Sequence, residues 1–244
     1  MDSLTIGWEY LTGYAVAATR PGGDPEWPPH PVRVFMALAA AWFETEPPSI
    51  ERRRKDEWDR EGTALRWLET LVEPLLLLPP EANVFERSTV TMYLPVNDKP
   101  DAHSQPDKKK KAKLFPYLGS VPIGRNRQPR TFPRVWVGSN PCFLHWPNAE
   151  GDEQHGIALE RVCRKVTRIG HSSSLVRMWL ADDGELDRSD GERLVVDDLM
   201  ADVQVRSISV GMLDTLIERF GDGPRRRFME LNDKIDELRR RLAR

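Results

Sequence analysis

Four prolines among the seven residues 25–31 constrain this chain more than any other feature of its sequence. Proline fixes φ at about −65° and biases the residue before it toward extended backbone, so this segment is a stiff loop. The loop carries one large aromatic side chain, Trp27. Pro31 suits the first turn of a helix, and apolar residues follow at helical spacing at positions 34, 35, 38, 39 and 42. The sequence therefore predicts a rigid loop, packed on a core or holding a ligand, that leads into a helix from Pro31 to about Phe43.

The spacing of apolar residues predicts an α+β fold. Residues alternate between apolar and polar over positions 4–10, which is typical of a strand with one buried face. Further strands are expected at 75–78 (strand or turn), 90–94, 134–138, 175–180 and 203–210, and further helices at 51–73, 157–169 and 212–220. Strand, helix, strand, strand, helix, strand is the order of the ferredoxin-like (RRM-like) fold, here with helical additions. We expect residues 1–220 to form one such domain, and residues 221–244, which carry a short heptad spacing, to form an amphipathic terminal helix or linker.

Positive charge is concentrated in one segment. The net charge is −2, yet residues 99–134 hold ten Lys or Arg against two Asp, a local balance of +8 that leaves −10 for the remainder. Phe115, Tyr117 and Phe132 lie among these cations. Single-stranded RNA binders combine stacking rings with cations that follow the backbone, so this segment favours RNA binding over a merely solvated loop. Residues 95–130 are rich in Pro, Gly and Lys without a period, so we expect a long basic excursion from the core.

The sequence gives no sign of several other classes of function. It has no apolar span of about 20 residues and no signal-peptide pattern, so we expect a cytoplasmic protein without a membrane partner. Cys142 and Cys163 lack a CxxC partner and are expected to be small buried hydrophobic residues. The acidic pairs 182–183 and 197–198 would point to opposite faces of a strand, and no GxxxxGK[ST] loop occurs. We therefore expect no metal site and no cofactor.

Three short segments near the start resemble the opening of a known family: 11–14 (Leu-Thr-Gly-Tyr), 18–20 (Ala-Thr-Arg) and 26–33 (Glu-Trp-Pro-Pro-His-Pro-Val-Arg), followed by an apolar helix ending at Trp42. The family is the RAMP subunit of type I-G (formerly I-U) CRISPR effector complexes. That subunit is a fusion of a handle-capping (Cas-five-like) half with a crRNA-processing (Cas-six-like) half, and the similarity is to the first half. The segments 130–138, 161–180 and 205–220 also fit, with Arg168-Ile169-Gly170-His171-Ser172-Ser173-Ser174 at the centre of the second.

The resemblance implies an RNA-binding subunit of a Cascade-like ribonucleoprotein of antiviral defence that caps the 5′ handle of crRNA. Residues 95–130 would correspond to the family's thumb, which bends the guide RNA. The implied partners are crRNA, a Cas-seven-like backbone subunit and a Cas-eight-like large subunit, with target DNA engaged indirectly. In the fused family a processing half would follow this segment, so we expect processing to reside in a Cas-six-like half or subunit outside this chain. The candidate RNA contacts are Arg20, Trp27, Arg33, Lys108, Lys109, Lys110, Lys111, Lys113, Arg125, Arg127, Arg130, Arg134, Arg168, His171 and Ser172.

Two alternative functions remain open at the level of sequence. Some handle-capping relatives cleave the repeat by metal-independent acid–base chemistry, for which histidine is suited near pH 7. His171 and His30 are the candidate catalytic residues, and His171 is the better one because Arg168 and Ser172–Ser174 offer adjacent phosphate donors. A turn hydrogen bond is the simpler interpretation of His171, so we favour a non-catalytic chain over an endoribonuclease. The other alternative is a structural adaptor between effector subunits.

Overall fold

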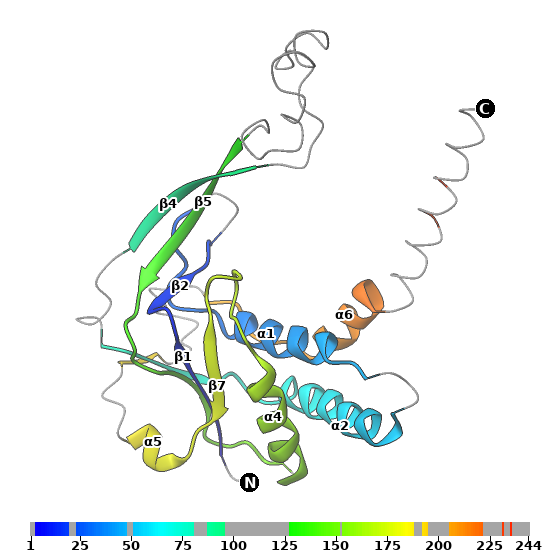
Figure 1. Cartoon of the computed structure of the whole chain (residues 1–244). Helices are drawn as coiled ribbons and strands as arrows, with labels where there is room; N and C mark the ends of the chain where they lie inside the picture. Colours follow the sequence, from blue (N-terminus) through cyan, green and yellow to red (C-terminus); the bar gives the residue numbers. More distant parts are fainter. Residues whose placement is uncertain are drawn as a thin grey trace, which may run out of the picture.

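The computed structural model describes residues 3–19, 23–47, 51–80, 87–95, 127–151, 153–187, 192–194 and 205–221, together with Leu231 and Ile235. Within these residues the chain forms two antiparallel sheets, with helices packed mainly on one side of the larger sheet (Figure 1). The predicted α+β class is confirmed. The predicted helix after the proline loop is confirmed as α1 (Pro31–Glu44), which His30 precedes at the N-cap position.

The larger sheet has the strand order β7-β1-β6-β3-β8. Its strands are β7 (Val176–Leu180), β1 (Leu4–Tyr10), β6 (Cys142–Trp146), β3 (Leu75–Leu78) and β8 (Glu192–Leu194), and neighbours pair antiparallel. In chain order, β1, β3, β6 and β7 are the four strands of a βαββαβ unit. The helices α1 and α2 (Arg52–Leu68) fill the first helical position, and α4 (Glu153–Lys165) fills the second. The spatial order of these four strands is fourth, first, third, second, which is the order of a ferredoxin-like sheet. The predicted ferredoxin-like class is therefore confirmed.

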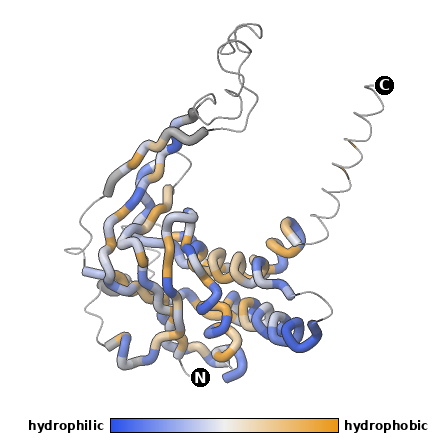
Figure 2. The backbone as a smooth tube through the Cα atoms, in the orientation of Figure 1, coloured by the Kyte–Doolittle hydropathy of each residue, from blue (hydrophilic) through white to orange (hydrophobic). Residues whose placement is uncertain are grey.

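The main core lies between this sheet and the helices. On β1 the alternating residues Leu4, Ile6, Trp8 and Tyr10 are buried against apolar faces of α1, α2 and α4. Figure 2 shows the apolar stretches of these elements inside the body and the polar ones outside. On the opposite face of the sheet a smaller cluster packs beneath α5 (Asp183–Asp187). Gly7 lies on that face, where a Cβ would come within 2.9 Å of the Trp179 ring, so only glycine lets the rings approach the strand.

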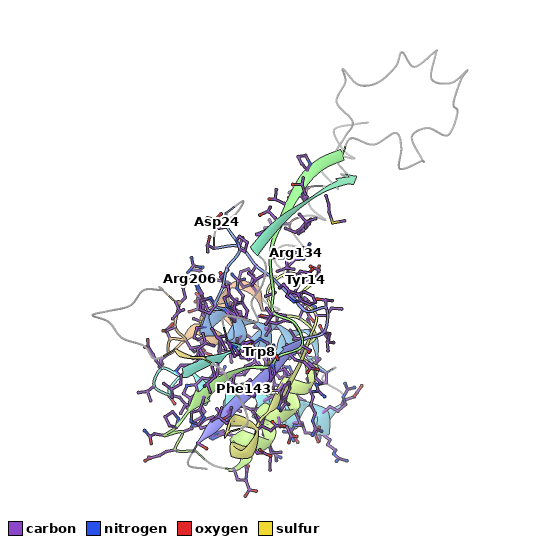
Figure 3. All side chains as sticks on the ribbon, turned by 90° about the vertical axis from the view of Figure 1, so that its left-hand side faces the viewer. Trp8, Tyr14, Asp24, Arg134, Phe143 and Arg206 are labelled. Atoms are coloured by element: carbon purple, nitrogen blue, oxygen red, sulfur yellow. The ribbon has the colours of Figure 1, made fainter. Side chains whose placement is uncertain are left out.

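The smaller sheet carries a long hairpin away from the body. Its order is β2-β5-β4, with β2 (Tyr14–Val16), β5 (Arg127–Trp136) and β4 (Arg87–Pro95). Nine residue pairs join β4 to β5, from Arg87 opposite Val135 to Pro95 opposite Arg127. Figures 1 and 3 show this hairpin rising from one end of the molecule. This hairpin is inserted between β3 and β6 and already begins at Arg87, ahead of the predicted excursion at 95–130, of which residues 96–126 lie outside the described residues.

Several sequence-based boundaries were wrong. The strand expected at 134–138 belongs to the smaller sheet, and the third strand of the core is β6, which the sequence analysis missed. Residues 205–210 form no strand, although the helix expected after them is confirmed as α6 (Met212–Phe220). The helix expected at 51–73 ends at Leu68, where turn hydrogen bonds from Thr70 and Leu71 replace the helical pattern. Of the terminal segment 221–244, only Gly221, Leu231 and Ile235 are described.

Candidate nucleic-acid interface

The proline loop is closed by a buried ion pair within its own sequence. Glu26 is almost fully buried, and its two carboxylate oxygens accept hydrogen bonds from Nε and Nη2 of Arg33, both at 2.5 Å. These bonds raise the pKa of the Arg33 guanidinium. The Trp27–Pro28 peptide bond is cis, and Trp27 is half-buried with its ring packed against the main core. The loop is therefore packed on the core and tied to α1 by this ion pair, while its ligand-holding interpretation, with Trp27 as an RNA contact, stays a prediction.

A tight turn, Gly170–Ser174, is fastened to β2 through Val16. The Val16 N–H donates to Ser174 Oγ at 2.6 Å, and Ser174 Oγ donates to the Val16 carbonyl at 3.2 Å. The His171 N–H also donates to that carbonyl, at 3.3 Å. Gly170 has a φ of 79°, and a Cβ there would lie 3.3 Å from the same carbonyl oxygen, so glycine is needed for the close approach. The turn presents His171, Ser172 and Ser173 to solvent from a fixed base.

A hollow of about 280 Å³ lies where this turn meets the foot of the β4–β5 hairpin. We call it the aromatic hollow. Its lining includes Tyr14 from β2, Phe132 and Arg134 from β5, and His171 and Ser173 from the turn. The Arg134 guanidinium carbon lies 4.3 Å from the centroid of the Tyr14 ring, and Figure 3 shows these two side chains together at the foot of the hairpin. The edge-on contact between Phe132 and His171 has a centroid separation of 4.7 Å.

Hydrogen bonds in the turn fix the chemistry of His171. The Ser173 N–H donates to His171 Nδ1 at 3.2 Å, and the Ser173 hydroxyl lies 2.8 Å from the same nitrogen. Because Nδ1 accepts, the neutral ring carries its proton on Nε2. His171 therefore makes the turn hydrogen bond that the sequence favoured and still offers Nε2–H as a donor.

His30 is in a different environment. Burial lowers its pKa, and the charges of Arg33 and Arg206 act in the same direction against the opposing charge of Glu26. A histidine whose pKa is lowered is neutral at pH 7. His30 can thus accept or donate a hydrogen bond there without adding positive charge.

Two other predicted contacts line a second cavity, of about 630 Å³, between α1 and residues 165–170. Arg33 and Arg168 lie there with Lys165 and Arg206, and we call it the α1 cleft. Arg168 donates from Nη2 to Glu44 at 2.6 Å, and Lys165 donates from Nζ to both oxygens of the buried Glu61. In Figure 3 the labelled Arg206 lies away from the Tyr14–Arg134 pair. Two of the predicted RNA contacts, Arg134 and His171, therefore line the aromatic hollow, and two others, Arg33 and Arg168, line the α1 cleft.

The remaining predicted residues are dispersed. Arg130 is exposed farther along β5, Ser172 is exposed in the turn, and Arg127 is the first residue of β5. Arg20, Lys108–Lys111, Lys113 and Arg125 lie outside the described residues. The sequence analysis did not select Tyr14, Lys165 or Arg206. Tyr14 belongs to the segment 11–14 that carries the family resemblance, but nothing in the sequence placed its ring beside Arg134.

Burial of both cysteines agrees with the sequence prediction. Their burial raises the pKa of both thiols, that of Cys163 to about 12. Within the described residues, no three His, Cys, Asp or Glu side chains gather as metal ligands would. The described helices also include none with the length and apolar content that a bilayer span requires.

The fold and the hollow define an α+β protein with a ferredoxin-like sheet and a site that combines aromatic rings with one guanidinium, that of Arg134. No family model matches the chain, and no curated protein matches it. Among solved structures, it is similar to the crystal structure of a CRISPR protein from Archaeoglobus fulgidus, with 13% sequence identity and a TM-score of 0.29. The match covers 75% of this chain and 60% of that protein. That TM-score is too low to establish a common fold, and the fold assignment rests instead on the strand order of the sheet.

Proposed function

We propose that this chain is a non-catalytic RNA-binding subunit of a type I CRISPR effector complex that binds and caps the 5′ handle of crRNA. The observation that supports RNA binding best is the aromatic hollow, where Tyr14, Phe132 and His171 from three separate segments converge beside Arg134. Base stacking on such rings tolerates any sequence, and a guanidinium beside them attracts phosphate. A hollow at the foot of a projecting hairpin suits a single strand better than a duplex.

The finer parts of this proposal rest on the sequence resemblance. They are the type I-G assignment, the handle as the bound segment, and the Cas-seven-like and Cas-eight-like partners. Residues 95–130 would act as the thumb, with their lysines following the phosphates. The described ends of that segment, Pro95 and Arg127, are neighbours across the β4–β5 hairpin, so a single excursion from the hairpin tip is compatible with such a role.

The test is binding of the chain to its repeat RNA in excess EDTA, followed on a native gel for retention and on a denaturing gel for cleavage. Phe132→Ala should weaken binding about 5- to 150-fold, because loss of one stacking platform costs about 1–3 kcal/mol. The matched control is Phe220→Ala, whose ring is exposed on α6 and lies outside the hollow. Equal affinities for the two variants, with both folded by circular dichroism, would contradict the proposed site.

A metal-independent endoribonuclease is the second candidate, favoured by an exposed His171 whose Nδ1 accepts a hydrogen bond from the turn, which leaves the proton of the neutral ring on Nε2. The same gels distinguish the two functions. Retention of uncut RNA supports the capping subunit. Chelator-resistant cleavage that His171→Ala or His30→Ala abolishes would replace it with the nuclease.

A further inference from the structure

The α1 cleft has an aliphatic floor. Val32, Met36, Ala37, Ala40 and Ala41 of α1 line it together with Met212 of α6. Ala37 and Ala41 are buried, but Met36 is 41% exposed and Ala40 is exposed too, so α1 is uncovered at these two positions in the described structure. Small residues three and four positions apart leave a groove along a helix into which a second helix can press a ridge of side chains. Methionines on either side allow the groove to adjust its shape.

Cations surround that floor. Arg33, Lys165, Arg168 and Arg206 line the cleft, and Glu44 is the one acidic residue among its described lining residues. Arg33 and Lys165 are held from behind by Glu26 and Glu61, each with a side chain only 2% exposed. Arg168 is bound to Glu44, which is 54% exposed and can be exchanged for another carboxylate. Among the residues that the structure describes, no carboxylate contacts Arg206. Two cations at the rim, Arg168 and Arg206, are therefore available to an incoming acid.

The chemistry of the α1 cleft differs from that of the aromatic hollow. The described residues that line the cleft include no aromatic ring, so they offer no platform for stacking a base. An aliphatic floor with cations along its rim is instead complementary to an amphipathic helix that carries Leu-like residues on one face and carboxylates beside them. Electrostatic complementarity of this kind steers association and selects the partner.

We propose that the α1 cleft is a docking site for an acidic amphipathic helix of a partner protein. Its apolar residues lie over Met36 and Ala40, and its carboxylates bind Arg206 and take the place of Glu44 at Arg168. This site is separate from the RNA site, and the proposal holds whether or not the chain binds RNA.

The test is site-specific photocrosslinking in cells of the native host, with p-benzoylphenylalanine at Ala40 and, as the control position, at Arg53 on the exposed side of α2. The expected product is a covalent adduct from position 40 alone. Its crosslinked partner peptide, sequenced by mass spectrometry, should contain more Asp and Glu than Lys and Arg. The double variant Arg168→Glu, Arg206→Glu should lower the adduct yield about tenfold or more, because it sets like charges against the partner.

A charge-matched control is Arg164→Glu combined with Arg53→Glu, since both side chains are exposed outside the cleft. This variant should leave the yield unchanged, and thermal melting of both variants checks that they are folded. Three results would each overturn the proposal: an adduct that ribonuclease removes, a protein adduct whose yield the reversal at Arg168 and Arg206 does not change, or no adduct above the position-53 control. The first of these would assign the cleft to RNA.

Discussion

The ion pair that closes the proline loop allows a quantitative prediction. In the Glu26→Gln variant the amide oxygen can still accept one hydrogen bond from Arg33, but the amide NH2 faces the other donor, and the charge is gone. Hydrogen bonds to charged groups contribute about 1.5–3 kcal/mol each, and breaking a buried pair costs about 3–5 kcal/mol. Arg33 is 28% exposed, so water can solvate part of its charge. We therefore expect the free energy of unfolding to fall by about 2–3 kcal/mol.

Denaturant unfolding followed by tryptophan fluorescence measures this loss. In thermal unfolding of a chain of this length, a loss of about 1 kcal/mol lowers the midpoint temperature by about 2–4 °C, so Glu26→Gln should lower it by roughly 4–12 °C. The matched control is Glu51→Gln, which removes one charge from an exposed pair with Arg54 at 2.7 Å and should change stability by less than about 0.5 kcal/mol. If Glu26→Gln lowers the free energy of unfolding no more than Glu51→Gln does, the loop does not fasten α1 to the core. The ligand-holding interpretation of the loop would then be favoured.

Three further predictions concern charge. Neutralising Lys108–Lys111 to Gln should reduce RNA affinity and make the slope of log affinity against log salt shallower by up to about 3, at about 0.7 for each phosphate released; an unchanged slope in filter binding would remove these lysines from the RNA site. Because the pKa of His30 is lowered from 6.5, the unfolded chain binds that proton first as pH falls, so unfolding free energy should decrease below about pH 6.5. His30→Gln should flatten this decrease in denaturant titrations between pH 7.5 and 5.5 at ~0.5 pH intervals, and an identical profile would refute the assignment. Glu69 is buried and accepts hydrogen bonds from the N–H groups of Gly211 and Leu213, at 2.8 and 2.5 Å, so Glu69→Ala should cost about 1–3 kcal/mol and speed amide exchange throughout α6. Exchange in α6 as slow as in the unmodified chain would show that this carboxylate does not cap it.

Features set by local sequence were predictable. The start of α1 follows from Pro31 and the apolar spacing after it, and β1 follows from strict alternation over residues 4–10. The missed strand β6 is short and nearly all buried, so it has no alternation to read. Its place depends on pairing with β1, from Leu4 opposite Trp146 to Trp8 opposite Cys142. Strand propensity was also misleading at residues 205–210. Their composition is typical of a strand, but they form none in the structure.

The residues of the candidate site also fall into two groups, those that local sequence predicted and those that it did not. Arg134 and His171 were predictable because each lies in a recognisable local setting, a run of cations and a Gly-Ser turn. Their neighbours were not, since Tyr14 reaches Arg134 only through the β2–β5 register that pairs Val16 with Arg134. A long-range backbone hydrogen bond, from the Val32 N–H to the Arg206 carbonyl at 3.1 Å, brings Arg206 to the α1 cleft. Contacts between residues so far apart in sequence leave no periodic signal.

The Gly170–Ser174 turn contributes residues both to the α1 cleft and to the aromatic hollow. Gly170 lines the α1 cleft, whereas His171 and Ser173 line the aromatic hollow. Ser174 is fully buried and holds the turn to both the N–H and the carbonyl of Val16. A turn anchored in this way is held in one arrangement and has no second arrangement to switch to. Occupancy of the cleft should therefore not alter the affinity for RNA at the hollow. The effects of substitutions on the two sides should therefore add, because coupling between separate sites requires shared partners or a movable element between them.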